Sequence, residues 1–229
     1  AYFTPGWTSY NERLQYQVYD VTNHLVTGKN AIGAMLGNGW YRGFLAWGDR
    51  NNHYGNDIAL LLQMTIEYED GTTQELITDD SWQSTKGPVV FSEIYDGETY
   101  DTQQEIYGWS KPNFSEQWEA VKEVDFAKKN LIATENELIK KQEQIKPVDR
   151  FEAKEGGTII DFGQNLVGWV QLSIKGKPGQ RIEIYHAEVL DKEENFYVDN
   201  LRDADQKMTY ILDGTKQILE PHFTFQGFR

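Results

Sequence analysis

The chain of 229 residues contains no cysteine. Disulfide bonds, thiolate metal sites and cysteine nucleophiles are therefore excluded, although the redox compartment stays open because many secreted proteins also lack cysteine. Long hydrophobic runs are missing too, since the longest, Ile58 to Leu62, is far shorter than a membrane-spanning helix. Ala1 to Trp7 has neither the basic start nor the apolar core of a signal peptide, and we expect the chain to be the middle of a longer protein.

Basic residues are few: 22 Lys and Arg stand against 36 Asp and Glu, and the formal net charge is -14. The electric field of such a chain repels phosphate backbones and anionic lipids, so we expect neither nucleic acid nor a membrane as a partner. The composition is compatible with any compartment, and a bacterial periplasmic or extracellular location is favoured over the cytoplasm.

Aromatic residues make up 14% of the chain and hydrophobic residues 39%, which is enough for a buried core. The length suits one large all-β domain or two ordinary domains. Apolar and polar residues alternate with a period of two in many short stretches, which predicts strands. The predicted strands cover residues 14–18, 31–36, 60–68, 73–77, 89–91, 158–162, 168–174, 181–187 and 208–212. This pattern favours an all-β fold of sandwiches or barrels over alternating strands and helices.

One lysine-rich segment allows two interpretations. Leu131, Leu138 and Ile145 recur every seven residues among Lys, Glu and Gln, a spacing typical of an amphipathic helix. The alternative is an extended connection that contains a strand. With either interpretation, two β-sandwiches joined across this segment are the simplest architecture.

Three glycines and four aromatic residues lie close together between Leu36 and Trp47. A strand interior is rarely written this way, because glycine adds entropic cost and offers nothing to pack. Flat rings beside hydrogen-bonding groups suit a sugar, whose C–H faces stack while its hydroxyls bind polar side chains. The candidate sugar-binding residues are Asn38, Trp40, Tyr41, Arg42 and Trp47. The alternative is a tight bend whose rings fill the core beneath it.

Asp96, Glu98 and Asp101 form a carboxylate cluster. An acid/base pair would need a pocket and one raised pKa, whereas the alternation around these residues favours a surface or interdomain polar network. The same structural use is predicted for Asp161, Gln164, Asn165 and Arg202. The glycines near Asp161 lack the spacing of a dinucleotide-binding loop.

The four histidines have no metal-ligand spacing, so no metal site is predicted. His186 falls on the inward face of a predicted strand, and we interpret it as a hydrogen-bonded core residue. No Ser-His-Asp set stands out.

Several stretches together resemble the bacterial alpha-L-rhamnosidases, glycoside hydrolases that remove terminal L-rhamnose. The motifs that carry the resemblance keep their order through nearly the whole chain; they are Tyr19-Asp20-Val21-Thr22, Leu36-Gly37-Asn38-Gly39-Trp40-Tyr41-Arg42-Gly43, Ile94-Tyr95-Asp96-Gly97-Glu98-Thr99-Tyr100-Asp101, Asp161-Phe162-Gly163-Gln164-Asn165-Leu166-Val167-Gly168-Trp169, His186-Ala187-Glu188-Val189-Leu190, Asn200-Leu201-Arg202 and residues 221–229.

The resemblance implies two non-catalytic domains. Residues 1–115 would form a jelly roll related to carbohydrate-binding modules, 116–146 a polar linker with an extended strand, and 147–229 a second β-sandwich. Catalysis would lie in a following helical α/α barrel that works with inversion. Such a mechanism needs two carboxyl groups roughly 6.5–9.5 Å apart, and no catalytic residue is assigned to this chain.

The resemblance also bears on ligands and partners. One branch of these modules binds its ligand and calcium through the loop that holds Asn38. The acidic calcium ligands have no match here, so we expect no cofactor, calcium being the only one that the resemblance raises. The expected partners are a carbohydrate containing L-rhamnose and the catalytic barrel of the same protein. A stand-alone lectin-like module and a purely structural scaffold are the alternatives.

Overall fold

The computed structural model describes residues 1–45 and 50–229, and over these ranges it is nearly all β. The strands are β1 (Leu14–Tyr16), β2 (Gln63–Glu67), β3 (Thr73–Ile77), β4 (Gln83–Ser84), β5 (Val89–Glu93), β6 (Gly97–Asp101), β7 (Glu119–Ala120), β8 (Leu131–Ala133), β9 (Asp149–Glu152), β10 (Thr158–Asp161), β11 (Leu166–Gly168), β12 (Leu172–Lys175), β13 (Arg181–Tyr185), β14 (Val189–Leu190), β15 (Phe196–Tyr197), β16 (Lys207–Ile211), β17 (Lys216–Leu219) and β18 (Gln226–Phe228). The helical elements in these ranges are the single turn α1 (Gly39–Arg42) and four 3-10 turns, η1 (Thr22–His24), η2 (Thr102–Gln104), η3 (Lys128–Asn130) and η4 (Asp199–Leu201). The predicted all-β class is confirmed.

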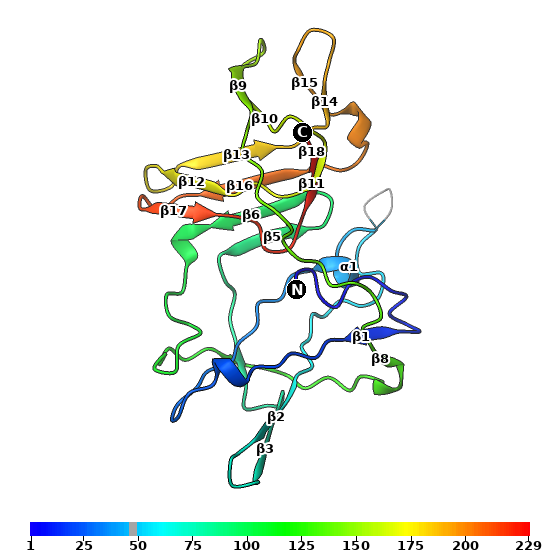
Figure 1. Ribbon diagram of the computed structural model, residues 1–229, viewed down its shortest axis with the longest axis vertical. Coiled ribbons are helices and arrows are strands. Elements are labelled where there is room, and N and C mark those ends of the chain that lie inside the picture. The colour runs from blue at the N-terminus through cyan, green and yellow to red at the C-terminus, as the bar shows by residue number, and fades with distance from the viewer. Residues whose placement is uncertain (46–49) are drawn as a thin grey trace.

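The core lies between two layers of strands. One layer is a four-stranded sheet in the order β13-β16-β6-β5, and the other is the antiparallel pair β12–β17 (Figure 1). Alternate residues of β16 point into the space between them, where Met208 and Tyr210 are each 1% exposed. Tyr100 from β6 and Leu219 from β17 complete the contact, so the best-packed part of the molecule is this two-layered sandwich.

This central sheet joins segments far apart in the sequence. β6 pairs in parallel with β16, which places Tyr100 opposite Tyr210. The predicted linker 116–146 therefore lies between strands of the same sheet. The domain limits stay a prediction, but the two halves are bound by backbone hydrogen bonds as well as by side-chain packing.

Local predictions from alternation agree well with the observed strands. Residues 73–77 form β3, which returns antiparallel to β2 through a turn at Asp70 and Gly71. Gly71 has a φ of 83°, which glycine adopts without strain. Asp70 Oδ1 accepts hydrogen bonds from Thr72 N and Oγ1, which closes the turn.

Two other segments test the predictions more sharply. Residues 125–146 contain η3 and β8 and no α-helix, as the interpretation of an extended connection with a strand predicts. β8 pairs in parallel with β1, and this pairing uses the backbone groups that a helix would have satisfied internally. The prediction of a strand at 31–36 is wrong: these residues are exposed and belong to no ladder, because alternation does not provide a pairing partner.

The rest of the molecule is more open. Long connections and the β2–β3 hairpin extend from the lower half, while the β9–β10 and β14–β15 hairpins project from the upper end (Figure 1). No described helix is long and apolar enough to cross a membrane.

Candidate functional site

The aromatic loop is a single helical turn held at the surface. Trp40 of α1 stacks on Trp7 from the N-terminal segment, with ring centroids 6.5 Å apart and planes within 6° of each other. Trp7 remains 49% exposed, and its Nε1 donates a hydrogen bond to Tyr54 Oη at 3.1 Å. The pair therefore presents indole surface to solvent beside a fixed hydroxyl, and we call this pair with Tyr54 the indole platform.

Tyrosine rings fix this platform from one side. The ring of Tyr41 lies 5.9 Å from that of Tyr10 and 6.2 Å from that of Tyr54, and Tyr10 contacts Tyr54 at 4.7 Å. Tyr10 is 5% exposed, and its burial raises the pKa of its hydroxyl. Trp40 and Tyr41 thus lie in one group of aromatic rings, whose other members were not identified from the sequence, and their role in sugar binding stays a prediction.

The side chain of Asn38 makes a structural hydrogen bond within the protein. Its Nδ2 donates to Glu93 Oε1 at 2.7 Å, and the backbone N–H of Phe44 donates to Glu93 Oε2 at 2.8 Å. Burial raises the pKa of Glu93, and these two hydrogen bonds act in the opposite direction. A Cβ at Gly43 would lie 2.4 Å from Glu93 Oε2, so glycine allows the loop to close on the carboxylate.

The last two candidate sugar-binding residues of the loop are Arg42 and Trp47. Arg42 ends α1 with an exposed side chain, whereas Trp47 lies outside the described residues. The buried carboxylate beside the loop, that of Glu93, accepts a hydrogen bond at each of its two oxygens. No group of three or more His, Asp or Glu side chains in the described ranges gathers as a metal site. The expectation of no cofactor stays a prediction.

Glu98, the middle carboxylate of the second motif, is a buried structural acceptor. Glu98 is 0% exposed; its Oε2 accepts the backbone N–H groups of His222 and Phe223, each at 2.9 Å. Its Oε1 lies 3.1 Å from His222 Nδ1, and the imidazole stacks on Tyr100 with centroids 5.0 Å apart. We call Glu98, His222 and Phe223 the Glu98 clamp. It ties β6 to the segment that leads into β18, and the predicted interdomain role of Glu98 stays a prediction.

The other predicted polar residues are spread over the molecule. Asp101 caps η2 by accepting a hydrogen bond from Gln103 N at 3.0 Å, and the Asp96 carbonyl accepts one from Lys207 N at 2.9 Å. A catalytic acid/base pair has to face an open cavity that admits substrate. Asp96, Glu98 and Asp101 do not share such a cavity in the described part of the chain.

Asp161 pairs with Arg229 at 3.0 Å and accepts a hydrogen bond from Gly163 N, and these contacts lower its pKa. Gln164 and Asn165 are exposed at the turn before β11. Arg202 is also exposed, with a φ of 60°.

Sequence reasoning missed Trp7, Tyr54, Glu93 and His222. The first two lie outside the glycine-rich loop, 33 residues or fewer from Trp40, and only their aromatic character signals a role. Glu93 ends a strand directly before the Ile94–Asp101 motif. Its partner Asn38 is 55 residues away, so no local spacing could reveal the pair.

Two family models match the chain. The model described as the alpha-L-rhamnosidase N-terminal domain matches residues 1–143, and that of the bacterial alpha-L-rhamnosidase concanavalin-like domain matches residues 151–229. The chain belongs to the alpha-L-rhamnosidase family. The resemblance predicted from the motifs is confirmed.

Individual alpha-L-rhamnosidases agree with this assignment. A curated alpha-L-rhamnosidase of Streptomyces avermitilis is 38% identical over 228 residues, which are 98% of this chain and 22% of that protein. The crystal structure of the Streptomyces avermitilis enzyme complexed with L-rhamnose matches with a TM-score of 0.91 at 35% identity, over 99% of this chain and 22% of that one. The native enzyme of Aspergillus terreus gives 0.90 at 35% identity, over 99% and 26%. The chain thus spans about a quarter of the length of these relatives.

Proposed function

We propose that this chain is the non-catalytic β-sandwich portion of an alpha-L-rhamnosidase, which hydrolyses terminal alpha-L-rhamnose from glycans or glycosides. Its task in that enzyme is to form a platform against which the catalytic barrel packs. The carboxylates of the chain support this division of labour, because Glu93, Glu98 and Asp161 accept hydrogen bonds that hold the fold together.

The observation that carries the proposal is the amount of exposed surface. The accessible area is 16407 Å² for a mass of 26.5 kDa. A compact monomer of that mass exposes about 10,700 Å². The difference, about 5,700 Å² on this chain alone, is larger than the roughly 1,000–2,500 Å² that one partner contributes to a large permanent interface, so it leaves room for more than one such contact. A platform that contacts further domains of the same protein accounts for such an excess.

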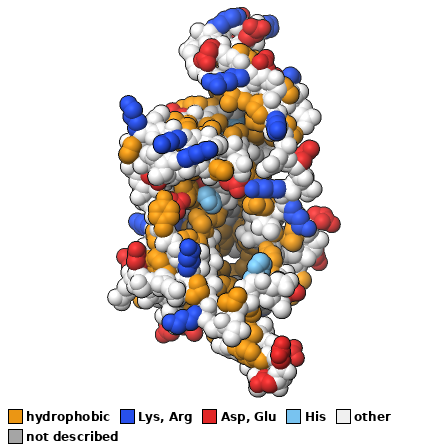
Figure 2. Space-filling model, turned by 60° about the vertical axis from the view of Figure 1, so that its left-hand side comes forward, with side chains coloured by type: hydrophobic (Ala, Val, Ile, Leu, Met, Phe, Trp, Pro, Cys, Tyr) orange, Lys and Arg blue, Asp and Glu red, His pale blue; other side chains and the backbone are white. Residues whose placement is uncertain are grey.

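The exposed surface also has the composition of an interface. Figure 2 shows hydrophobic side chains gathered along the middle of one face, with Lys and Arg beside them. Large hydrophobic side chains that are at least 49% exposed include Val18, Tyr19, Val26, Leu61, Ile77, Val90, Val124, Val148, Val167, Val189 and Ile218. Water contact on this scale is unfavourable by about 25 cal/mol per Å² of apolar area, which further domains would relieve.

An activity measurement tests the division of labour. We expect the homogeneous 229-residue chain to release no nitrophenol from 4-nitrophenyl alpha-L-rhamnoside, whereas the full-length protein that contains it hydrolyses this substrate. Turnover that co-purifies with the chain would contradict the non-catalytic role. A full-length protein that hydrolyses other aryl glycosides but not this one would contradict the proposed activity.

A second function is favoured by the Trp7–Trp40 pair. In this case the chain also binds L-rhamnose as a lectin-like module, with the exposed indole face under the sugar and Tyr54 Oη beside it. Stacking contributes about 0.5–1.5 kcal/mol beyond the roughly 25 cal/mol per Å² of apolar area that it buries, so weak affinity, of millimolar order, is expected.

Calorimetric titration with L-rhamnose separates the lectin-like module from a pure scaffold. We expect Trp7→Ala to abolish the heat of binding, whereas Trp82→Ala, which removes an indole distant from this platform, leaves it unchanged. Circular dichroism checks that both variants are folded. A wild-type chain that gives no heat at millimolar sugar would leave the aromatic loop with a purely structural role.

A further inference from the structure

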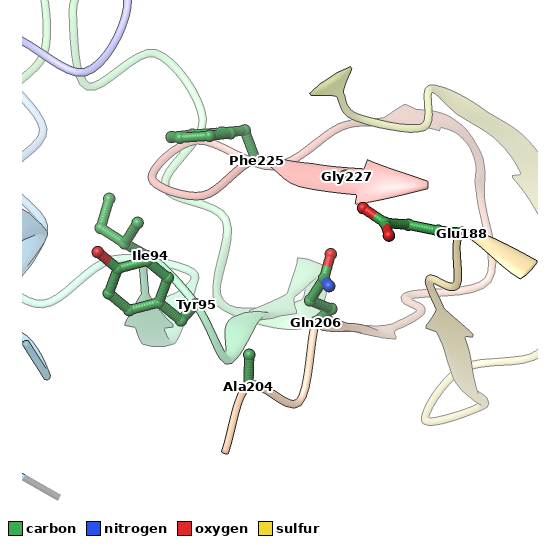
Figure 3. A pocket seen from close by; sticks show the side chains of 7 residues that line it. All are labelled: Ile94, Tyr95, Glu188, Ala204, Gln206, Phe225 and Gly227. Atoms are coloured by element: carbon green, nitrogen blue, oxygen red, sulfur yellow. The ribbon is translucent and has the colours of Figure 1, made fainter. Parts of the chain in front are cut away.

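A separate cavity of about 190 Å³ lies beside β18 and shares no lining residue with the Trp7–Trp40 pair. Three segments distant in the sequence form most of its wall, and Glu188 completes it. Ile94 and Tyr95 follow β5, Ala204 and Gln206 precede β16, and Phe225 comes directly before β18. Figure 3 shows the side chains of these segments arranged around one space.

Gln206 is the unusual residue of this cavity. Its backbone has a φ of 46°, a left-handed conformation that costs a non-glycine residue free energy. Both of its backbone groups are held: its N–H donates to Tyr95 O at 3.1 Å, and its carbonyl lies 2.7 Å from His186 Nδ1. The fixed backbone directs the side chain toward the cavity (Figure 3), where the buried Oε1 has no hydrogen-bond partner among residues 1–45 and 50–229. An unmet buried acceptor is unfavourable and calls for a donor.

A second acceptor enters from the opposite wall. The carboxylate of Glu188 extends beneath β18 at Gly227 (Figure 3). A Cβ at Gly227 would lie 3.2 Å from Glu188 Oε1, so the glycine leaves room for the carboxylate at this place. Glu188 also accepts a long hydrogen bond, 3.5 Å, from Asn200 Nδ2. The carboxylate is therefore positioned but not saturated, since it has sites for further donors.

The rest of the wall is apolar. The ring of Phe225 lies above the space, with Ile94, Tyr95 and Ala204 on its other sides (Figure 3). A flat apolar face next to acceptors fits a compact molecule that has C–H groups on one side and O–H donors on the other. We propose that this cavity is a binding subsite for one monosaccharide unit, whose hydroxyls donate to Gln206 Oε1 and Glu188 while a C–H face covers Phe225.

A cationic ligand is the main competitor, because the acceptors and the ring also suit an ammonium or guanidinium group. Among the described residues, one carboxylate lines the cavity, that of Glu188, and it is exposed to solvent. Attraction between a cation and one exposed carboxylate is weak in water. Neutral hydroxyls lose less hydration than a cation and satisfy the amide acceptor equally well, which favours the sugar.

Nuclear magnetic resonance titration of the full chain tests the subsite. The probes are L-rhamnose, D-glucose and, for the competing ligand class, methylguanidinium. At least one sugar is expected to shift the side-chain amide signals of Gln206 and the backbone signals of Ala204 and Gly227. The indole N–H signals of Trp7 and Trp40 report the lectin-like platform separately, and hydrolysis is not involved, so failure here is distinct from failure of the proposed function.

Matched variants locate the binding. Glu188→Gln keeps the shape of the side chain but removes its charge, and Phe225→Leu keeps an apolar residue but removes the ring. Each is expected to raise the dissociation constant of the sugar about tenfold. Glu155→Gln makes the same charge change on the exposed β9–β10 turn and is expected to leave it unchanged.

Three results would overturn the proposal: no shift at these residues with either sugar, shifts with methylguanidinium alone, or sugar-induced shifts that Glu188→Gln and Phe225→Leu leave unaltered. Because Glu188 is a surface carboxylate, its variant tests the proposal even if Phe225→Leu does not fold.

Discussion

Replacing Glu98 by alanine is expected to destabilise the chain strongly. The substitution removes the acceptor of two backbone N–H groups, those of His222 and Phe223, and the partner of the His222 imidazole. Each donor left without an acceptor costs about 1–3 kcal/mol. Since His222 and Phe223 are partly exposed, water can reach them, and we expect a total near the low end, about 3 kcal/mol. That is a large part of the 5–15 kcal/mol by which domains are usually stable.

Urea denaturation followed by tryptophan fluorescence measures this loss. With a slope of roughly 3 kcal/mol per M, about 3 kcal/mol lowers the midpoint by about 1 M. Glu98→Gln provides the chemical comparison, because its Oε1 can still accept the two backbone N–H groups while the charge is lost; about 1 kcal/mol is expected. Glu67→Ala, at an exposed position of β2, serves as the matched control, within about 0.5 kcal/mol of wild type.

Comparison of these three variants shows whether the hydrogen bonds of Glu98 stabilise the fold. If Glu98→Ala unfolds at the same urea concentration as Glu67→Ala, the clamp does not hold the two halves together. If Glu98→Gln is as damaging as Glu98→Ala, the charge, and not the hydrogen-bond geometry, would be the stabilising property.

Two further predictions concern the same region. A Cβ at Gly97 would lie 1.8 Å from Lys207 O, so Gly97→Ala is expected to lower the free energy of unfolding by on the order of 3 kcal/mol or more. Gly156→Ala is the control: Gly156 also has a positive φ but open space around it, and about 1 kcal/mol is expected. Equal melting temperatures of the two variants would contradict the clash at Gly97. Burial lowers the pKa of His186 in the folded chain, so below pH ~6.5 the unfolded chain binds a proton that the folded chain does not. The contribution of His186 to the free energy of unfolding is therefore complete above that pH. As the pH decreases further, this contribution falls by up to about 1.4 kcal/mol per pH unit. Urea titrations at several pH values should therefore show a shallower acid loss for His186→Gln than for wild type, and an unchanged slope would refute the assignment.

Local strands were predictable because their signal is local. β3 and its Asp70-Gly71 turn follow directly from alternation and turn chemistry, and the buried His186 follows from its place on an inward strand face. The pairing of β6 with β16 was not predictable, because residues 97–101 and 207–211 are more than 100 positions apart and alternation does not specify a partner. The family resemblance, rather than pattern, decided that residues 125–146 are extended.

The candidate site shows the same division. Clustered aromatics and glycines mark the loop of Trp40, so its surface location could be anticipated. The role of Asn38 could not, because the buried carboxylate of Glu93 reaches the loop only in the folded chain. Polar side chains that look available in sequence are thus consumed by long-range structural contacts.

Hydrogen–deuterium exchange, compared between the isolated chain and the full-length protein that contains it, tests most directly whether further domains cover the exposed apolar surface of this chain. If further domains pack on this chain, exchange in the full-length protein is slower over segments with exposed apolar side chains. The largest effect is expected at residues 17–36, where Val18, Tyr19 and Val26 face solvent. The strands β6 and β16, already buried in the isolated chain, should exchange equally slowly in both. Identical exchange of residues 17–36 and of the other exposed apolar segments in the two samples would contradict the claim that further domains cover this surface.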